Sequence, residues 1–409
     1  MQYTVFETFV GAGGSHLGFK NNGFKSVFVN DIEQNCIKTL LHNNPEIKDT
    51  AIVSVQDMTT LNPLELLKQM NMNKGELDVM FGGIVCKGFS LAGERSPSDP
   101  RNKFYQYQLN LVKEIMPKIS VIENVPGIIN AKILSKDTPA SVIEEVDSLW
   151  QELEDYKGIK AYARKNGAVT DEMEKIGKVL RVRKSQLLNK LEQGNYLISV
   201  SEDIIDTYES IGYVVKKKVL NSASFGSHTK RERIIFVAVR SDINIEYQYP
   251  EPLFANESDF LTVGDALKTI DYSIKDKDNE PMKHDKKTIE RFSYVKEGEN
   301  LARIVDQLPD ELKISKFYSR GSTMRLDSKK PSPTLVPGHS NFPIHPFEDR
   351  CITVREAATI TGFPNDYEFF GSHTKRCEQV GNAVPPALST AIAKQCKALL
   401  DKYYSKENK

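Results

Sequence analysis

The sequence predicts an α/β fold, in which helices cover both faces of a parallel sheet and a smaller second domain follows. Three observations lead to this prediction. Short apolar runs of strand length alternate with helix-length segments from residue 3 to residue 125. A glycine-rich turn follows the first run, and acidic side chains follow several later runs. Parallel strands bring such residues to one edge of the sheet, where α/β proteins bind their ligands.

Hydrophobic periodicity predicts the individual elements. We expect strands over residues 3–10, 26–29, 52–55, 77–81, 120–122, 213–220 and 234–239. We expect helices over residues 17–22, 104–116, 143–156, 171–193, 200–210 and 387–403. Thr353 and Glu356 have the spacing of a capping box, which predicts the start of one more helix, and Gly362 predicts its end.

Length and composition limit the class of protein. A chain of 409 residues exceeds one compact core, so we expect more than one domain. The 55 basic and 55 acidic residues balance, which argues against a protein that coats polyanions but allows a locally basic cleft. No apolar run reaches the ~18 residues of a membrane span, and the N-terminus enters a strand without a signal sequence, so we expect a cytoplasmic protein.

Two regions depart from the alternation of strands and helices. Residues 130–197 form a charged, helix-prone insertion, whose basic residues from Lys175 to Lys184 fit either a solvated helical face or contacts with phosphates. Residues 241–350 are polar and rich in Pro, Lys and Asp, and we expect them to form the second, smaller domain. The five cysteines are scattered without metal-ligand spacing, so we expect neither disulfides nor a metal site.

The first candidate site lies at the glycine-rich turn, Phe9 to Gly14. Glycines between a strand and a helix let the backbone approach a ligand, although the spacing differs from the dinucleotide fingerprint. Asp31 and Asp57 follow the next two strands, and an acid about twenty residues after such a turn can hold a ribose. The pattern favours an adenosine-type ligand; a tight turn without ligand and simple helix caps are the alternatives.

The second candidate site combines a thiol with charged groups. Cys86 lies in a glycine-flanked loop at the carboxyl end of a strand, and Glu123 ends another strand. Arg231 and Arg233 are two residues apart at the start of a strand, so their side chains would point to one face. These groups could supply a nucleophile, a proton donor and anion anchors. An inert buried thiol and structural salt bridges are the alternatives.

Taken in order, these segments resemble the cytosine-C5 DNA methyltransferase family. The matching pieces span almost the whole chain and are Phe9–Gly14, Cys86–Ser90, Glu123–Val125, Arg231–Arg233, Arg355–Ala358 and Gly381–Val384. The resemblance implies a Rossmann-like domain over residues 1–240 that binds S-adenosylmethionine, with residues 351–409 returning to it. It also implies that residues 241–350 are a target-recognition domain, which reads double-stranded DNA in the major groove.

The resemblance also implies roles for single residues. Phe9, Gly11, Gly13 and Gly14 would line the methionine end of the cofactor, and Asp31 would hold its ribose. Asp57 and Met58 would contact the adenine, and Ile32 stands where the family often stacks an aromatic ring on it. Phe104 and Asn382 would complete the cofactor site.

The chemistry of the reaction agrees with these roles. Cytosine C5 is a poor nucleophile until a thiolate adds to C6, and Cys86 would supply that thiolate. Glu123 would provide the proton that N3 then needs, while Arg231 and Arg233 would hold the base oxygen and a flanking phosphate. The target base must leave the duplex to be reached, at a cost of a few kcal/mol.

The sequence departs from the family pattern at a few positions, and the substrate stays open at this point. Val85 and Lys87 replace the usual Pro and Gln beside the nucleophile, and Thr229 replaces a Gln before the arginines. We expect a monomeric DNA methyltransferase, with a restriction endonuclease that acts on the same sequence as a candidate counterpart. An RNA cytosine-C5 methyltransferase and a catalytically silent DNA-binding relative are the alternatives.

Overall fold

The protein is described here by a computed structural model that covers residues 2–84, 96–99, 103–314, 323–336 and 342–407. The chain divides into two compact units. The first comprises Met1–Gly83, Glu114–Glu123 and Lys216–Lys409, and the second comprises Ile84–Lys113 and Asn124–Val215.

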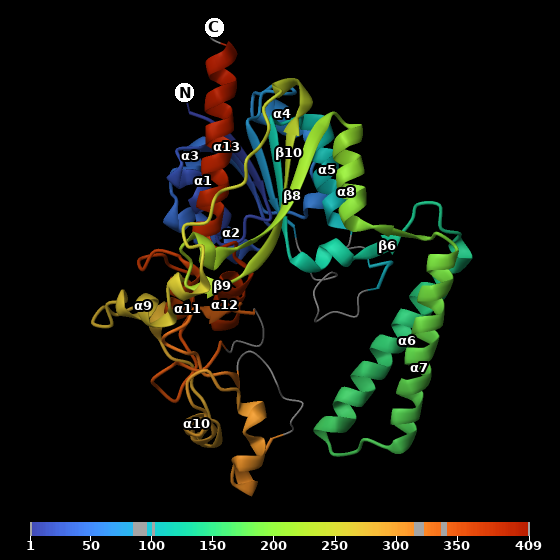
Figure 1. The fold of residues 1–409 in the computed structure, drawn as a ribbon, viewed down its shortest axis with the longest axis vertical. Helices are drawn as coiled ribbons and strands as arrows, with labels where there is room; N and C mark the ends of the chain where they lie inside the picture. Colours follow the sequence, from blue (N-terminus) through green and yellow to red (C-terminus); the bar gives the residue numbers. More distant parts are fainter. Residues whose placement is uncertain (1, 85–95, 100–102, 315–322, 337–341, 408–409) are drawn as a thin grey trace. The chain divides into compact units, whose positions relative to one another are not determined.

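A seven-stranded sheet forms the centre of the fold, in the order β3-β2-β1-β4-β5-β10-β8 (Figure 1). Its strands are β1 (Thr4–Thr8), β2 (Lys25–Asn30), β3 (Ile52–Ser54), β4 (Val79–Gly83), β5 (Ile119–Asn124), β8 (Tyr213–Asn221) and β10 (Glu232–Arg240). The five strands β3, β2, β1, β4 and β5 run parallel to one another. The prediction of an α/β fold around a parallel sheet is therefore confirmed.

Strand β10 runs in the opposite direction to β5. The amide of Arg240, at the end of β10, donates a hydrogen bond to the carbonyl of Lys118, which precedes β5. At the other end, Arg233 lies beside Glu123. The strand–helix alternation that predicts parallel pairing ends before β10, so the sequence pattern did not specify this direction.

Nine helices of the first unit fall within the described residues. They are α1 (Gly14–Asn21), α2 (Gln34–Asn43), α3 (Ile47–Thr50), α4 (Pro63–Gln69), α9 (Val263–Lys268), α10 (Lys286–Ser293), α11 (Val354–Thr361), α12 (His373–Asn382) and α13 (Pro386–Glu407). Helix α11 has the predicted capping box between Thr353 and Glu356, and Gly362 caps its end. Both predictions for this helix are confirmed.

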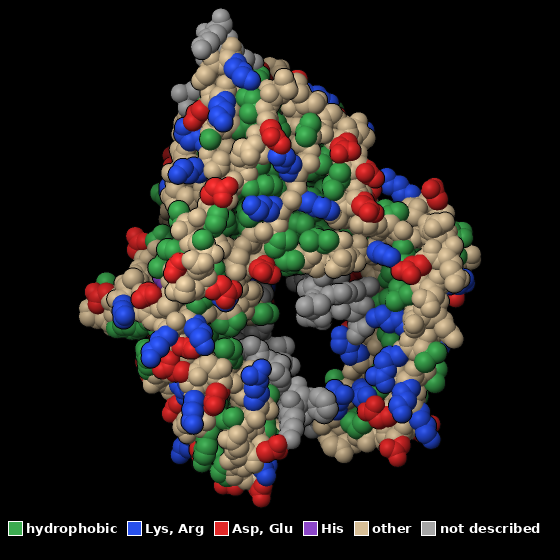
Figure 2. Space-filling view, viewed as in Figure 1, with side chains coloured by type: hydrophobic (Ala, Val, Ile, Leu, Met, Phe, Trp, Pro, Cys, Tyr) green, Lys and Arg blue, Asp and Glu red, His purple; other side chains and the backbone are tan. Residues whose placement is uncertain are grey.

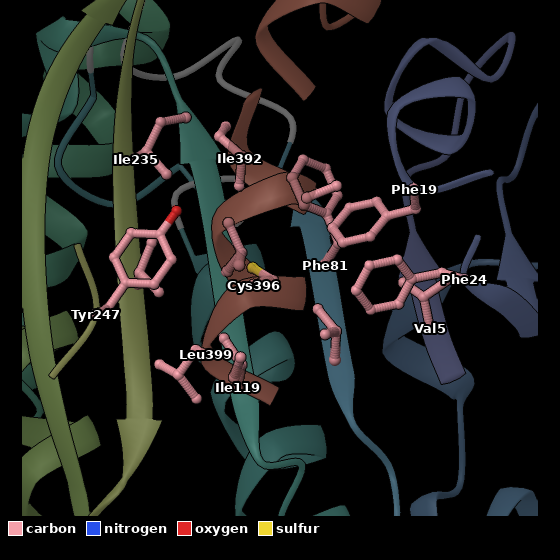
Figure 3. Close-up of a cluster of buried hydrophobic side chains, with 14 of the residues drawn as sticks. Val5, Phe19, Phe24, Phe81, Ile119, Ile235, Tyr247, Ile392, Cys396 and Leu399 are labelled. Atoms are coloured by element: carbon pink, nitrogen blue, oxygen red, sulfur yellow. The ribbon is translucent and has the colours of Figure 1, made fainter. Parts of the chain in front are cut away.

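The last helix packs against the first strands. Ile392, Cys396 and Leu399 of α13 are buried in one apolar cluster with Phe81 of β4 and Ile119 of β5 (Figure 3). Helix α13 also lies along α1. This cluster contains residues from both terminal parts of the chain. The C-terminal helix is therefore part of the core that supports the strands and their carboxyl ends.

The contact between α1 and α13 leads to a stability prediction. A methyl group at Gly18 would clash with the side chain and backbone of Ser389. We expect Gly18→Ala to force the helices apart and to lower the free energy of unfolding by about 2 kcal/mol, as overpacked cores do. Urea denaturation followed by circular dichroism measures this change. Gly158→Ala is the control, because a Cβ there meets nothing within 4 Å and alanine favours a helix.

In the described part of residues 241–350, which leaves out 315–322 and 337–341, the longest elements are α9 and α10. The other elements there are short 3₁₀ turns and β11 (Ser332–Pro333), which pairs in parallel with β9 (Thr229–Lys230). Phe292, Leu312 and Ile344 contribute to an apolar cluster within this region.

The second unit contains a long helical hairpin. Helices α6 (Ala140–Lys165) and α7 (Asp171–Gln193) lie side by side (Figure 1) around an apolar cluster that includes Trp150, Leu180 and Leu187. The described part of the unit also contains most of α5 (Phe104–Ile115), α8 (Val200–Ser210) and the antiparallel pair β6 (Lys132–Leu134) and β7 (Leu197–Ser199). Helix α7 has the predicted bounds, whereas α6 extends beyond residues 143–156 at both ends, and Lys160 in its extension pairs with Glu174 across the hairpin.

Three other properties bear on the class of protein. None of the helices in the described ranges has the length and apolar character needed to cross a membrane. In the same ranges, no three His, Cys, Asp or Glu side chains come together as a metal site would require. The four described cysteines, Cys36, Cys351, Cys377 and Cys396, are free thiols.

Candidate active site

The carboxyl ends of four parallel strands align at one edge of the sheet. Thr8 of β1 is in register with Asn30 of β2 and with Gly82 of β4. Gly83 of β4 is in register with Glu123 of β5. The residues that follow these strands therefore meet at the edge where the sequence places both candidate sites.

Gly83 lies where the two candidate sites meet. A Cβ at this position would be 3.7 Å from Oε2 of Glu123 and 3.7 Å from the carbonyl oxygen of Phe9. The glycine turn and the predicted catalytic acid are thus neighbours at the end of β4. The segment that follows, residues 85–95 with Val85, Cys86 and Lys87, lies outside the described residues, so the role of Cys86 stays a prediction.

The other cysteines are unsuited to act as nucleophiles. Burial raises the thiol pKa of Cys36, Cys351, Cys377 and Cys396 well above the ordinary range. These thiols stay protonated at neutral pH, and the thiolate is the reactive form of cysteine. If the reaction uses a cysteine thiolate, Cys86 is the remaining candidate.

Two glycines of the turn have no room for a side chain, whereas the third has open space around it. A side chain at Gly14 would clash with the Val384 carbonyl, and a Cβ at Gly13 would lie 2.7 Å from the Tyr367 hydroxyl. A Cβ at Gly11, which has a φ of 56°, would meet no atom within 4 Å. The Gly11 end of the turn is therefore the part that a ligand can approach.

Asp31 connects the second strand to this turn. Its Oδ2 accepts a hydrogen bond of 2.9 Å from the amide of Gly11, and its Oδ1 accepts one of 2.8 Å from the amide of Glu33. Burial raises the pKa of Asp31, although the amide hydrogen bonds act in the other direction. Each carboxylate oxygen retains a second lone pair, so Asp31 can still accept hydrogen bonds from a ligand.

An exposed apolar side chain lies next to this carboxylate. Ile32 is 63% exposed, which is unusual for isoleucine, and it directly follows Asp31. The open space at Gly11, the Asp31 carboxylate and the Ile32 side chain together offer room for a ligand, an acceptor for its hydroxyl groups and an apolar surface. These features fit the nucleoside part of S-adenosylmethionine.

For the remaining predicted cofactor residues, the structure gives their local surroundings and no contact with Gly11 or Asp31 among the described interactions. The Asp57 side chain caps the 3₁₀ turn Met58–Thr60 by accepting a hydrogen bond from Thr59, and Met58 is buried. Asn382 ends α12 in the first unit and is exposed. Phe104 begins α5 in the second unit. Within the first unit the structure thus brings Phe9, Gly11, Asp31 and Ile32 together, and the roles of Asp57, Met58, Phe104 and Asn382 stay predictions.

The glycine turn rests on a buried polar network that sequence reasoning missed. Glu7, in the middle of β1, is fully buried. Its carboxylate lies 2.9 Å from Nδ1 of His16 and accepts a hydrogen bond of 3.0 Å from Ser15. The hydroxyl of Tyr367 donates a hydrogen bond of 2.6 Å to the carbonyl of Ala12. An acid within an apolar strand was the only signal for this network in the sequence.

Glu123 and Arg233 form a buried ion pair at the sheet edge. Arg233 Nε lies 2.7 Å from Glu123 Oε1, and the two side chains are 11% and 8% exposed. Arg233 Nη1 also donates to the carbonyl of Glu232. Among the described residues no other hydrogen bond involves this carboxylate, so Oε2, which faces Gly83, can bond to a substrate.

Arg231 has a different partner from Arg233. Its Nη1 donates a hydrogen bond of 2.7 Å to the carbonyl of Gly381 in α12. Thr229, two residues earlier in β9, donates to the carbonyl of Pro333 in β11. Arg233 therefore contacts the predicted acid, while Arg231 connects this strand to the C-terminal segment.

Comparisons with known proteins identify the family of this chain. The family model of the C-5 cytosine-specific DNA methylase matches residues 3–150 and 186–398. The Type II methyltransferase M1.HphI of Haemophilus parahaemolyticus is 31% identical over 402 residues, which are 96% of this chain and 86% of that protein. The Type II methyltransferase M.Eco47II of Escherichia coli is 30% identical over 413 residues, covering 98% and 80%.

The fold is also similar to that of a solved structure. The crystal structure of a prophage-encoded Escherichia coli protein superposes with a TM-score of 0.65 and 22% identity, over 98% of this chain and 100% of that chain. The family model covers the glycine turn, Glu123 and both arginines. The chain therefore belongs to the C-5 cytosine-specific DNA methylase family, and its class of enzyme is DNA (cytosine-5-)-methyltransferase.

Proposed function

We propose that the protein transfers a methyl group from S-adenosylmethionine to C5 of a flipped-out cytosine within a specific DNA sequence. The observation that carries this proposal is the Glu123–Arg233 ion pair at the end of β5, beside strand β4, which Cys86 follows in the sequence. An acid whose free oxygen faces that strand end is placed to bond with N3 of a base held there.

Each residue has a defined task in the proposed reaction. The Cys86 thiolate forms a bond to C6, and the displaced ring electrons become available at C5 while N3 takes a proton. Glu123 holds that proton, and Arg233 fixes the orientation of the Glu123 carboxyl group. Once C5 carries the methyl group and the cofactor is left as S-adenosylhomocysteine, a base removes the C5 proton and the bond from sulfur to C6 breaks. Cys86 leaves as a thiolate, and N3 returns its proton to Glu123.

The methyl donor binds at the turn after β1 in this proposal. S-adenosylmethionine supplies an electrophilic methyl group when it is bound. Asp31 accepts hydrogen bonds from its ribose, and the turn from Phe9 to Gly14 holds its methionine end. Ile32, Asp57 and Met58 contact the adenine, and Phe104 and Asn382 complete the site. The open space at Gly11 and the exposed Ile32 support this assignment.

The proposal makes the affinity for the cofactor depend on pH through Asp31. The ionised carboxylate is the form that accepts ribose hydrogen bonds, and burial raises the pKa of Asp31. Affinity should therefore fall as the pH drops through this raised pKa, whereas folding stability gains from the same protonation. We expect Asp31→Asn to weaken binding at neutral pH about 10-fold or more and to flatten this dependence.

Isothermal titration calorimetry with S-adenosylhomocysteine across a pH series measures both effects. Asp49→Asn is the matched control, because Asp49 is an exposed aspartate in α3. An Asp31→Asn protein with the affinity and pH dependence of the unmodified protein would exclude Asp31 from the cofactor site.

Residues 1–240 and 351–409 form the catalytic domain in this proposal, and residues 241–350 are the target-recognition domain. The pairing of β11 with β9 supports it, because it connects the exit of residues 241–350 to the segment that leads into Arg231. The enzyme would act as a monomer on double-stranded DNA in the cytoplasm. It would protect a sequence that a cognate restriction endonuclease cleaves, as the names of the Type II relatives suggest.

Transfer of a labelled methyl group tests the substrate. We expect label from S-adenosylmethionine to enter duplex DNA, at cytosine C5, and not to enter total RNA. Transfer to RNA alone would replace the proposal with the RNA cytosine-C5 alternative. A folded protein that binds the cofactor and labels neither nucleic acid would support the catalytically silent alternative.

A further inference from the structure

The tip of the α6/α7 hairpin is an addition to the family pattern. The family model matches residues 3–150 and 186–398 and leaves out residues 151–185. These residues form the second half of α6, the connecting turn and the first half of α7. The catalytic groups all lie elsewhere, so the catalytic chemistry does not account for this part of the chain.

Helix α7 carries a long segment without acidic residues. From Lys175 to Leu191 the sequence has six basic residues and no Asp or Glu, although the whole protein has no net charge. Figure 2 shows Lys and Arg side chains gathered over the hairpin. A helical surface that serves only for solubility normally mixes both signs of charge, as α6 does.

Half of these basic residues are used within the hairpin. Arg183 pairs with Glu152, Lys190 pairs with Glu145, and Lys184 lies over the ring of Trp150. Lys175, Lys178 and Arg181 are exposed, and they form no ion pair or hydrogen bond with another described residue. These three side chains are therefore open to solvent, although Arg181 also acts electrostatically on Glu174 of the same helix.

Lys175, Lys178 and Arg181 lie on the solvent side of α7. Leu180, Leu187 and Leu191 are buried against α6. With 3.6 residues per turn, the opposite side carries Lys175, Lys178, Val182, Ser185, Gln186 and Asn189, with Arg181 beside Lys178, and all of these residues are exposed. The side chains are cationic, hydroxyl, amide or aliphatic. Cationic, hydroxyl and amide groups are those that contact phosphate oxygens in protein–DNA complexes.

We propose that this side of α7 binds the sugar-phosphate backbone of duplex DNA, through Lys175, Lys178 and Arg181. From Lys175 to Asn189 the surface is about 21 Å long, at 1.5 Å per residue. Duplex DNA carries one charge per ~1.7 Å of axis, so several phosphates lie within that length. That the nucleic acid is DNA rests on the proposed function. The contact with phosphates would not depend on the base sequence of the DNA.

A charge-matched pair of variants tests this surface. The test variant is K175A/K178A/R181A, in which alanine preserves the helix. The control, K48A/K68A/K394A, removes the same charge from exposed lysines outside the hairpin. The measurement is the affinity of the full-length protein for a linear duplex of random sequence over a series of salt concentrations. Circular dichroism checks that both variants are folded.

We expect the test variant to bind roughly tenfold more weakly at low salt, and the slope of log affinity against log salt to fall by about one per lost phosphate contact, or about three in total. The control should retain the slope of the unmodified protein. Equal slopes for the two variants would overturn the inference, and so would a larger effect on duplex RNA than on DNA. Because binding needs no chemistry, a slope change without methyl transfer would refute the proposed function and leave this inference standing.

Discussion

Cys86→Ala is expected to abolish methyl transfer to DNA, with a loss of at least about a thousandfold, because removal of a catalytic nucleophile leaves only binding and electrostatic effects. The four described cysteines have raised thiol pKa values and cannot replace it at neutral pH. Affinity for S-adenosylhomocysteine should be unchanged, since no cofactor role is assigned to this thiol. Initial rates with labelled cofactor measure the loss.

Cys36→Ala is the control for this variant. Cys36 is half-buried and lies in α2, away from Glu123 and Arg233 in the sequence, and its thiol is protonated at neutral pH. We expect this protein to keep its activity. Substantial transfer by a Cys86→Ala protein would show that the reaction does not proceed through a bond between Cys86 and C6.

Glu123→Gln should lower the rate of transfer by about 10² to 10⁴, the range for loss of a positioned acid–base group. It also leaves the Arg233 guanidinium without its carboxylate in a nearly buried position. Loss of one partner of a buried pair costs about 3 kcal/mol or more, so the free energy of unfolding should fall as well. Rates and urea denaturation of the same preparation separate the two effects.

Glu232, which precedes Arg233 in the sequence, supplies the control for Glu123. Glu232→Gln makes the same chemical change at an exposed side chain of β10, and we expect neither rate nor stability to change. The double variant Glu123→Gln/Arg233→Ala tests the coupling, because residues that act as a unit lose activity non-additively. Additive losses would show that Arg233 does not act through Glu123.

Much of the fold follows from local patterns in the sequence. The strand–helix alternation that predicts parallel pairing of β1 to β5, the capping box at Thr353 and the bounds of α7 each depend on residues close together in the chain. Periodicity and capping describe such local features. They also place Asp31 and Glu123 at strand ends, which the structure shows to lie at one edge of the sheet.

Long-range contacts could not be predicted in this way. Tyr367 hydrogen-bonds to Ala12, 355 residues away in the sequence. Only glycine fits at position 14, because a side chain there would clash with the backbone of Val384. Sequence periodicity carries no information on which distant segments meet. The ion pair between Arg233 and Glu123 depends likewise on the antiparallel direction of β10, which the strand–helix alternation did not specify.

The most direct test of the account is bisulfite sequencing of a plasmid from cells that express the protein, beside the same plasmid from cells that express Cys86→Ser. Methylation at C5 protects cytosine from conversion. The account predicts protected cytosines in one short, recurring sequence, and none with the variant. Complete conversion of both plasmids, with both proteins folded and abundant, would contradict the claim that this chain methylates C5 of cytosine in DNA.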